Sequence, residues 1–130
     1  MRKEWMRVLF VIAGLYDAIL GIAFLSMPGR LFRMFDVPPP NHFGYVTFPA
    51  LLLIVFALMY FRIACDPVKF RVLIPFGIGL KIAYCSTVFW YDLTAGIPSM
   101  WMPWAWADLV FLALFLFAWR VTGNPATRNE

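Results

Sequence analysis

The sequence predicts an all-α protein, a membrane-embedded four-helix bundle whose antiparallel helices run up, down, up and down. Hydrophobic residues make up 63% of its 130 residues and charged residues 14%, whereas a water-soluble domain is about half apolar and about a quarter charged. A soluble chain this short buries too small a fraction of its surface to hide so much apolar area. The apolar residues form four runs, and most basic residues lie at the ends of these runs.

The four runs have the length of transmembrane helices within one domain, residues 1–130. A helix rises about 1.5 Å per residue, so that roughly 20 residues cross the ~30 Å hydrocarbon core of a bilayer. A helix pairs its own backbone groups there, whereas a β-barrel needs alternating polar and apolar residues, which residues 51–56 lack. We therefore predict helices at about residues 8–27, 45–61, 72–90 and 103–119.

Lysine and arginine predict the orientation of these helices. Both chain ends and the link between the second and third runs carry eight of them, whereas the opposite side carries only Arg30 and Arg33. Basic residues are retained in the cytoplasm, so both termini are predicted to be cytoplasmic. Asp17 interrupts the first run and no cleavage site follows, so we interpret this run as a retained helix. The eight residues are Arg2, Lys3, Arg7, Arg62, Lys69, Arg71, Arg120 and Arg128.

The connections between the runs have distinct compositions. Residues 29–35 are predicted to form a short helix along the interface in the first outer loop, and the three prolines at 38–40 prevent its continuation. Residues 62–71 read as a tight polar hairpin, residues 92–102 as a loop and residues 121–130 as a frayed tail. Tryptophan and tyrosine at the run ends are interpreted as interfacial anchors. They are Trp5, Trp90, Tyr91, Trp101, Trp104, Trp106 and Trp119.

Three charged residues, Asp17, Lys81 and Asp108, lie inside apolar runs. A charge at the bilayer centre costs about 2.5–3.5 kcal/mol on insertion scales, and such residues usually face the interior and pair. Asp17 and Lys81 each follow a basic flank by ten residues on helices of the same direction, which places both at a depth of ~15 Å. Asp108 lies roughly 3 Å further out, a distance that a lysine stem spans. We predict an Asp17–Lys81 pair, with Asp108 joining it or lying just outward.

The neighbours of these charges support an interior polar face. Tyr84, Cys85 and Val88 follow Lys81 by three, four and seven residues and share its side of the helix. Gly14 and Gly21 share a side with Asp17 and would let another helix approach closely. The candidate cluster is Asp17, Lys81, Asp108, Tyr84 and Tyr16. The third run is rich in glycine, proline and hydroxyl residues, so we expect the other helices to enclose it.

Several functions fit this cluster. The first hypothesis is a binding or accessory membrane module with a polar site for a lipophilic small molecule or a partner helix. A small proton, ion or solute transporter using the same residues is the second. A purely structural ion pair that fixes helix register is the alternative to both. Asp108 also lies shortly after Pro103, where a helix N-terminus stabilises a carboxylate without help from Lys81.

Enzymatic and cofactor motifs are missing from the sequence. His42 is the only histidine, so a bis-histidine haem is excluded and a zinc site is not expected. No phosphate-binding, dinucleotide-binding, metalloprotease or nucleophile-elbow motif occurs. We predict no cofactor, no metal and no nucleic-acid partner, since the basic residues form no stripe. An acid–base site made of Asp, Lys and Tyr in lipid is the one enzymatic alternative left open.

Several motifs resemble a group of small four-helix bacterial membrane proteins without an established function. They include Leu15-Tyr-Asp-Ala-Ile-Leu-Gly21, Pro38-Pro-Pro-Asn-His42, Cys65-Asp-Pro67 and Gly79-Leu-Lys81. In size and hydropathy the chain is also similar to DoxX-like proteins, some of which are associated with quinone-linked oxidoreductases. These resemblances imply a location in the bacterial inner membrane and a quinone-linked redox subunit as a third function. Self-association is a further expectation, since four helices alone leave little room for a wide pore.

Overall fold

The computed structural model describes residues 4–128, except for the side chains of residues 127 and 128. The described residues form helices and no strand, which confirms the prediction of an all-α chain. Four of these helices are long and apolar enough to cross a membrane, as predicted. Arg2 and Lys3, which contributed to the predicted orientation, lie outside the described residues, as does the side chain of Arg128.

Residues 4–128 form four long helices and several short ones. The short helix α2 occupies most of the stretch predicted to form a helix in the first connection. In chain order the elements are α1 (Glu4–Ser26), α2 (Pro28–Met34), α3 (Gly44–Cys65), the 3-10 turn η1 (Arg71–Leu73), α4 (Ile74–Thr94), the 3-10 turn η2 (Ser99–Trp101), α5 (Met102–Thr122) and α6 (Pro125–Arg128).

The long helices extend beyond the predicted apolar runs. α1 begins at Glu4 instead of residue 8, and α3 ends at Cys65 instead of residue 61. α4 and α5 likewise end at Thr94 and Thr122 instead of residues 90 and 119. The predictions were short because residues beyond each apolar run continue the same helical backbone hydrogen bonding. The hairpin between α3 and α4 is therefore shorter than predicted, and α6 forms where the tail was expected to be frayed.

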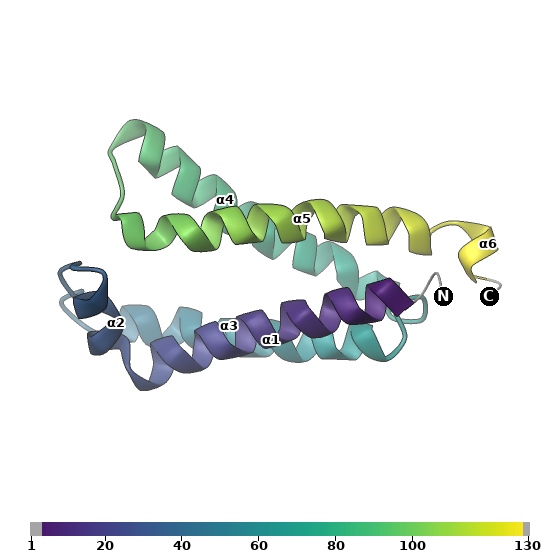
Figure 1. Cartoon of the computed structure of the whole chain (residues 1–130), viewed down its shortest axis with the longest axis horizontal. Coiled ribbons are helices and arrows are strands. Elements are labelled where there is room, and N and C mark those ends of the chain that lie inside the picture. The colour runs from purple at the N-terminus through teal and green to yellow at the C-terminus, as the bar shows by residue number, and fades with distance from the viewer. Residues whose placement is uncertain (1–3, 129–130) are drawn as a thin grey trace.

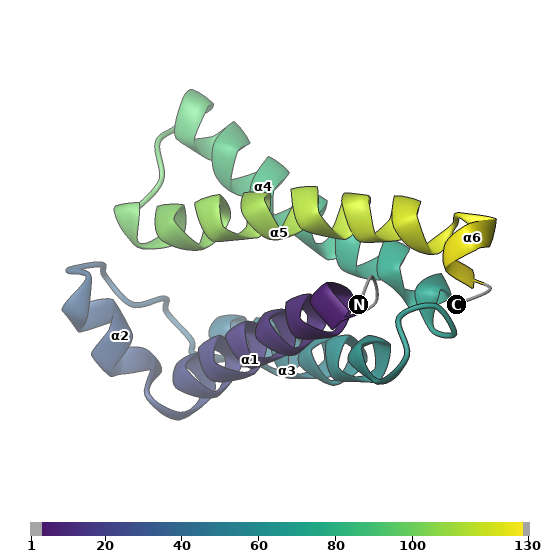
Figure 2. The same cartoon turned by 45° about the vertical axis from the view of Figure 1, so that its right-hand side comes forward.

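The long helices pack as two pairs. α1 packs closely along α3, and α4 packs on α5, whereas the two pairs have far fewer contacts with each other. In Figures 1 and 2 the N- and C-terminal ends lie at one end of the molecule, and α2 lies at the other. Both views also show α4 diverging from α5 toward the end that carries α2.

Two separate apolar clusters hold the pairs together. The cluster at the end with the termini is centred on Phe10, Tyr60 and Phe115, with ring centroids 4.9 Å apart for Phe10–Phe115 and 5.2 Å for Tyr60–Phe115. Beside it, Arg71 Nη2 donates to the Trp119 carbonyl oxygen at 3.1 Å and links η1 to α5. The second cluster surrounds α2 and consists of Phe24, Phe32, Val46, Ala50 and Met100. The candidate site borders both clusters, because Tyr60 of the first contacts Lys81 and Phe24 of the second lines the cavity beside it.

Close packing of α1 on α3 depends on small residues beside Asp17. A Cβ atom added to Gly21 would lie 2.7 Å from the Ala50 carbonyl oxygen, so only glycine fits there. This contact confirms the predicted close approach of another helix next to Asp17.

The prediction that the other helices enclose α4 is wrong. Only 28% of its membrane-length window is buried, as in α3. A Cβ atom added to Gly79 would have no neighbour within 4 Å. Enclosure is unnecessary because the Ser86 and Thr87 hydroxyls donate to the Ala83 carbonyl oxygen within α4, at 3.1 and 2.7 Å.

We predict that Gly21→Ala lowers the thermal unfolding midpoint in mild detergent, whereas Gly79→Ala does not. The new methyl group at residue 21 must push α1 away from the α3 backbone, and overpacking of this kind costs about 1–3 kcal/mol. At residue 79 the same methyl group meets open space and improves helix propensity. Circular dichroism during heating measures both variants. Equal midpoints for the two would contradict the close packing of α1 on α3.

Candidate functional site

The centre of the candidate site is a buried cluster of one lysine and two aspartates. Lys81 Nζ on α4 donates to Asp17 Oδ1 on α1 at 3.2 Å and to Asp108 Oδ1 on α5 at 2.9 Å. Asp17 and Lys81 are fully buried, and Asp108 is 7% exposed. The structure thus brings together the three charges in the arrangement expected from their depths. Because Asp17 belongs to one helix pair and Lys81 and Asp108 to the other, the cluster joins the pairs.

Aromatic rings surround the lysine ammonium group on its remaining sides. Lys81 Nζ lies 5.7 Å from the ring centroid of Tyr16, 5.6 Å from that of Tyr60 and 5.3 Å from that of Phe111. A cation within about 6 Å of an aromatic face is attracted by the negative charge of that face, most strongly where water is excluded. Carboxylate oxygens and rings together therefore replace the water that Lys81 loses on burial.

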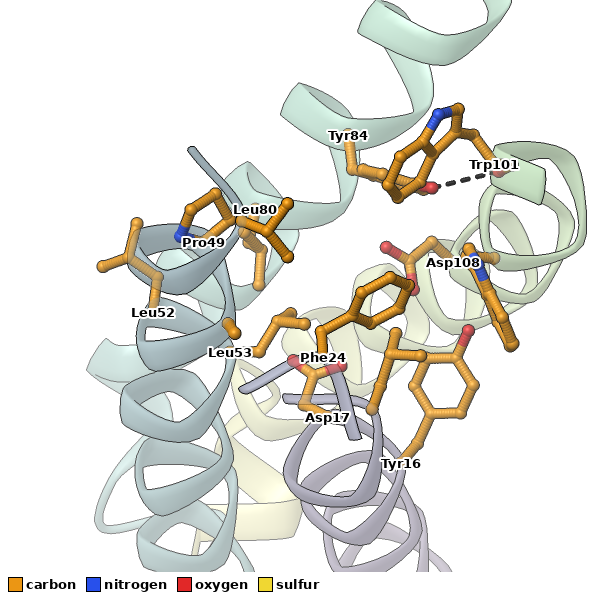
Figure 3. Close-up of a pocket in the computed structure, with 14 residues that line it drawn as sticks. Tyr16, Asp17, Phe24, Pro49, Leu52, Leu53, Leu80, Tyr84, Trp101 and Asp108 are labelled. Carbon is orange, nitrogen blue, oxygen red and sulfur yellow. Dashed lines mark hydrogen bonds between the residues drawn. The ribbon is translucent and has the colours of Figure 1, made fainter. Parts of the chain in front are cut away.

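A cavity of about 210 Å³ lies beside this cluster, with Asp17 and Asp108 in its wall. Figure 3 shows both carboxylates facing the space around Phe24. Helices α1, α3, α4 and α5 all contribute side chains, most of them apolar. The lining residues are Tyr16, Asp17, Leu20, Phe24, Val46, Pro49, Ala50, Leu52, Leu53, Leu80, Tyr84, Trp101, Trp104 and Asp108.

Tyr16 and Tyr84, the two tyrosines predicted at the site, both line the cavity but are held differently. Tyr84 donates its hydroxyl to the Trp101 carbonyl oxygen at 3.0 Å, which ties α4 to η2 across the cavity (Figure 3). Tyr16 presents its ring to Lys81, and its hydroxyl has no hydrogen-bond partner among the described residues. Tyr84 therefore shapes the wall, while the Tyr16 hydroxyl keeps its capacity to form a hydrogen bond.

Two of the outer tryptophans, Trp101 and Trp104, have contacts that the predicted interfacial anchoring does not account for. Both line the cavity, and Trp101 stacks on Phe24 with ring centroids 5.9 Å apart. The buried Nε1 of Trp104 has no hydrogen-bond partner among the described residues. A signal was present in the sequence, since these residues precede Asp108 by seven and four positions and so share its helix face.

No comparable signal in the sequence indicates that α3 contributes to the site. Val46, Pro49, Ala50 and Leu53 follow a helical spacing and line the cavity, but α3 carries no charged residue in its membrane-length run before Arg62. An apolar face toward a cavity and an apolar face toward lipid have the same composition. For the same reason the sequence did not predict Tyr60 at the site, although its ring on α3 contacts the Lys81 ammonium group.

The arrangement is chemically suited to binding. Buried polar atoms without a partner among the described residues include Tyr16 Oη, Asp17 Oδ2 and Trp104 Nε1, and all three residues line the cavity. A buried polar atom that lacks a hydrogen bond costs about 1–3 kcal/mol. A ligand with one polar group and an apolar body would satisfy such atoms and fill the apolar remainder.

No protein-family model, curated protein or solved structure matches this chain. The resemblance to small four-helix bacterial membrane proteins and to DoxX-like proteins therefore stays a prediction. The function has to be argued from the site itself, because a fold of this kind hosts unrelated functions.

We predict that Lys81→Met is more damaging than Lys81→Met combined with Asp17→Asn. The single change leaves two buried carboxylates without their cation, at a cost of about 3–5 kcal/mol. The second change removes one of these charges and should recover part of the lost stability. Thermal unfolding midpoints and the yield of monodisperse protein in detergent measure the effect. A double variant no more stable than the single one would show that Asp17 and Lys81 are not energetically coupled.

Proposed function

We propose that this chain is an integral membrane binding module whose cavity takes a lipophilic small molecule. One observation carries the proposal: two buried carboxylates, Asp17 and Asp108, form part of the wall of an otherwise mainly apolar cavity. A structural ion pair needs no cavity beside it and no surplus polar atoms. Ligand sites combine a mostly apolar wall with a few polar groups that orient the ligand.

The setting that we propose for this module is a lipid bilayer. All four long helices carry large apolar side chains on the outside, for example Ile19 (67% exposed), Leu58 (64%), Phe76 (64%) and Val110 (61%). Exposed apolar surface on every side of a monomer is unfavourable in water, and acyl chains would cover it. A further proposal from the sequence resemblance is that the membrane is the bacterial inner membrane.

Within that bilayer we propose an antiparallel up-down-up-down bundle with both termini in the cytoplasm. The two described chain ends lie together in Figure 1, which supports an even number of crossings. Arg62 and Arg120, in the last turns of α3 and α5, are basic residues that the cytoplasmic side retains. α2 would then lie along the outer interface.

A ligand can enter this cavity from the bilayer. Pro49 and Leu52 line the cavity and are also exposed on the outside of the molecule, so the wall of the cavity is part of the lipid-facing surface. Pro49 lies inside α3 and has no backbone N–H to donate, which locally loosens the helix at this point of the wall.

A small molecule suits the cavity better than a partner helix does. A helix with its side chains is about 10 Å across, whereas a cavity of about 210 Å³ accommodates only part of such a cylinder. A quinone-linked subunit would use the same cavity, but this alternative rests on the resemblance alone.

We predict that Leu80→Trp removes the bound small molecule, whereas Ile82→Trp does not. Leu80 lines the cavity (Figure 3), while Ile82 on the same helix is 50% exposed and outside the lining. An indole at residue 80 fills the space that the ligand needs. Native mass spectrometry of protein extracted gently from its membrane measures the retained ligand. Equal retention by both variants would place binding outside this cavity.

Measurements of proton and ion flux distinguish a binding module from a transporter that uses the same residues. For a binding module, proteoliposomes should show no proton or ion flux above that of protein-free liposomes. A flux that Asp17→Asn abolishes, and that Asp92→Asn on the exposed end of α4 preserves, would favour the transporter. A pH-sensitive dye and an ion-selective electrode measure the two fluxes.

A further inference from the structure

The buried cluster contains more negative than positive charge. One ammonium group, Lys81 Nζ, faces two carboxylates, Asp17 and Asp108, so the cluster has a formal charge of −1. An uncompensated charge in a low-dielectric interior costs several kcal/mol even after relaxation. The cluster is therefore best matched by one additional positive charge.

The two aspartates use their oxygens unequally. Each carboxylate accepts from Lys81 through Oδ1. Asp17 Oδ2 is fully buried and has no hydrogen-bond partner among the described residues, and Asp17 is part of the cavity wall (Figure 3). Protonation of this oxygen would remove the negative charge but would leave the new O–H without an acceptor. A donor that carries its own positive charge satisfies both requirements.

The cavity wall offers the other partner that an ammonium group needs. Tyr16, Phe24, Tyr84, Trp101 and Trp104 are aromatic residues of the lining. Lys81 shows how an ammonium group is bound in the neighbouring interior, since two carboxylate oxygens and three aromatic rings contact its Nζ. Aromatic faces attract organic cations by the same mechanism.

We infer that the ligand is a lipophilic monocation whose protonated amine donates to Asp17 Oδ2 and whose apolar body occupies the cavity. This inference rests on the proposed function and adds the chemical class of the ligand. The ammonium group neutralises the cluster, and the chain packs on the leucine residues of the wall, Leu20, Leu53 and Leu80.

Other head groups meet only part of these requirements. A hydroxyl group donates to Asp17 Oδ2 but leaves the charge of −1 uncompensated. A carboxylate or phosphate head adds like charge beside Asp17 and Asp108. The head groups can therefore be ranked by affinity, with the ammonium first, the hydroxyl second and the anion last.

Two photoreactive probes that differ only in the head group test this ranking. One is dodecylamine and the other dodecanol, each with a diazirine on the chain, added to the full chain in phosphatidylcholine nanodiscs. Mass spectrometry maps the crosslinks. The amine probe should label Leu20, Leu53 or Leu80, and unlabelled dodecylamine should compete about ten- to hundredfold better than dodecanol, the range for a charge-assisted hydrogen bond. Dodecanoate should compete least.

Asp17→Asn supplies the matched variant. The amide has the shape of the carboxylate, and the Lys81–Asp108 pair at 2.9 Å keeps its own balanced charge, so the variant should fold. Amine labelling of the cavity should fall by about ten- to hundredfold, while labelling by the alcohol probe should change little. Asp92→Asn, an equal change of charge at an exposed site on α4, should leave both unchanged.

The outcomes separate this inference from the proposed function. If the alcohol probe labels the cavity as well as the amine does, or if Asp17→Asn leaves amine labelling intact, the ligand class is wrong and the binding module stands. If neither probe labels a cavity residue, the proposed function fails and the inference fails with it. The two probes are compared on the unaltered chain. This comparison can contradict the inference even if the Asp17→Asn variant misfolds.

Discussion

The burial of Lys81 is the constraint on which the rest of the structure depends. Its ammonium group lies midway along a membrane-length helix and is fully buried, so neither bulk water nor a lipid headgroup solvates it. A charge in that position is tolerated only where opposite charges and hydrogen-bond acceptors meet it closely. Asp17 and Asp108 meet it from different helix pairs. Because Lys81 needs both carboxylates close to its ammonium group, it constrains the position of one helix pair relative to the other.

The cavity follows from where the apolar contacts are placed. Large aromatic side chains fill the interior at the end with the termini, around Phe10, Tyr60 and Phe115. The second cluster packs α2 against α1 and α3 and reaches the other pair mainly through Met100 and Trp101. Between the clusters the pairs meet through Lys81 and the two aspartates and through aromatic contacts such as Tyr16–Phe111. The polar cluster thus adds a link between the pairs, and its two aspartates form part of the cavity wall.

An ion pair that only fixed helix register would need one acid. The second acid gives the cluster its surplus negative charge, and Asp17, whose Oδ2 has no hydrogen-bond partner among the described residues, is part of the cavity wall. A surplus of this kind costs stability in the empty protein, which is the expected cost of a site prepared for a ligand. The same reasoning explains why aromatic residues gather around the lysine, since they stabilise a cation without neutralising the acids.

Depth along each helix was determined by the sequence alone, and lateral position was not. Each helical residue adds a fixed rise of about 1.5 Å, so counting from the basic flanks placed Asp17 and Lys81 at one level and Asp108 roughly 3 Å further out. Which face of a helix meets which neighbour depends on contacts between side chains far apart in the chain. On α3, where lipid and cavity favour the same apolar residues, only the tertiary structure decided that Tyr60 contacts Lys81 and that Pro49 and Leu53 line the cavity. The exposure of α4 was also decided only by the tertiary structure. The helix tolerates this exposure because the Ser86 and Thr87 hydroxyls donate within α4.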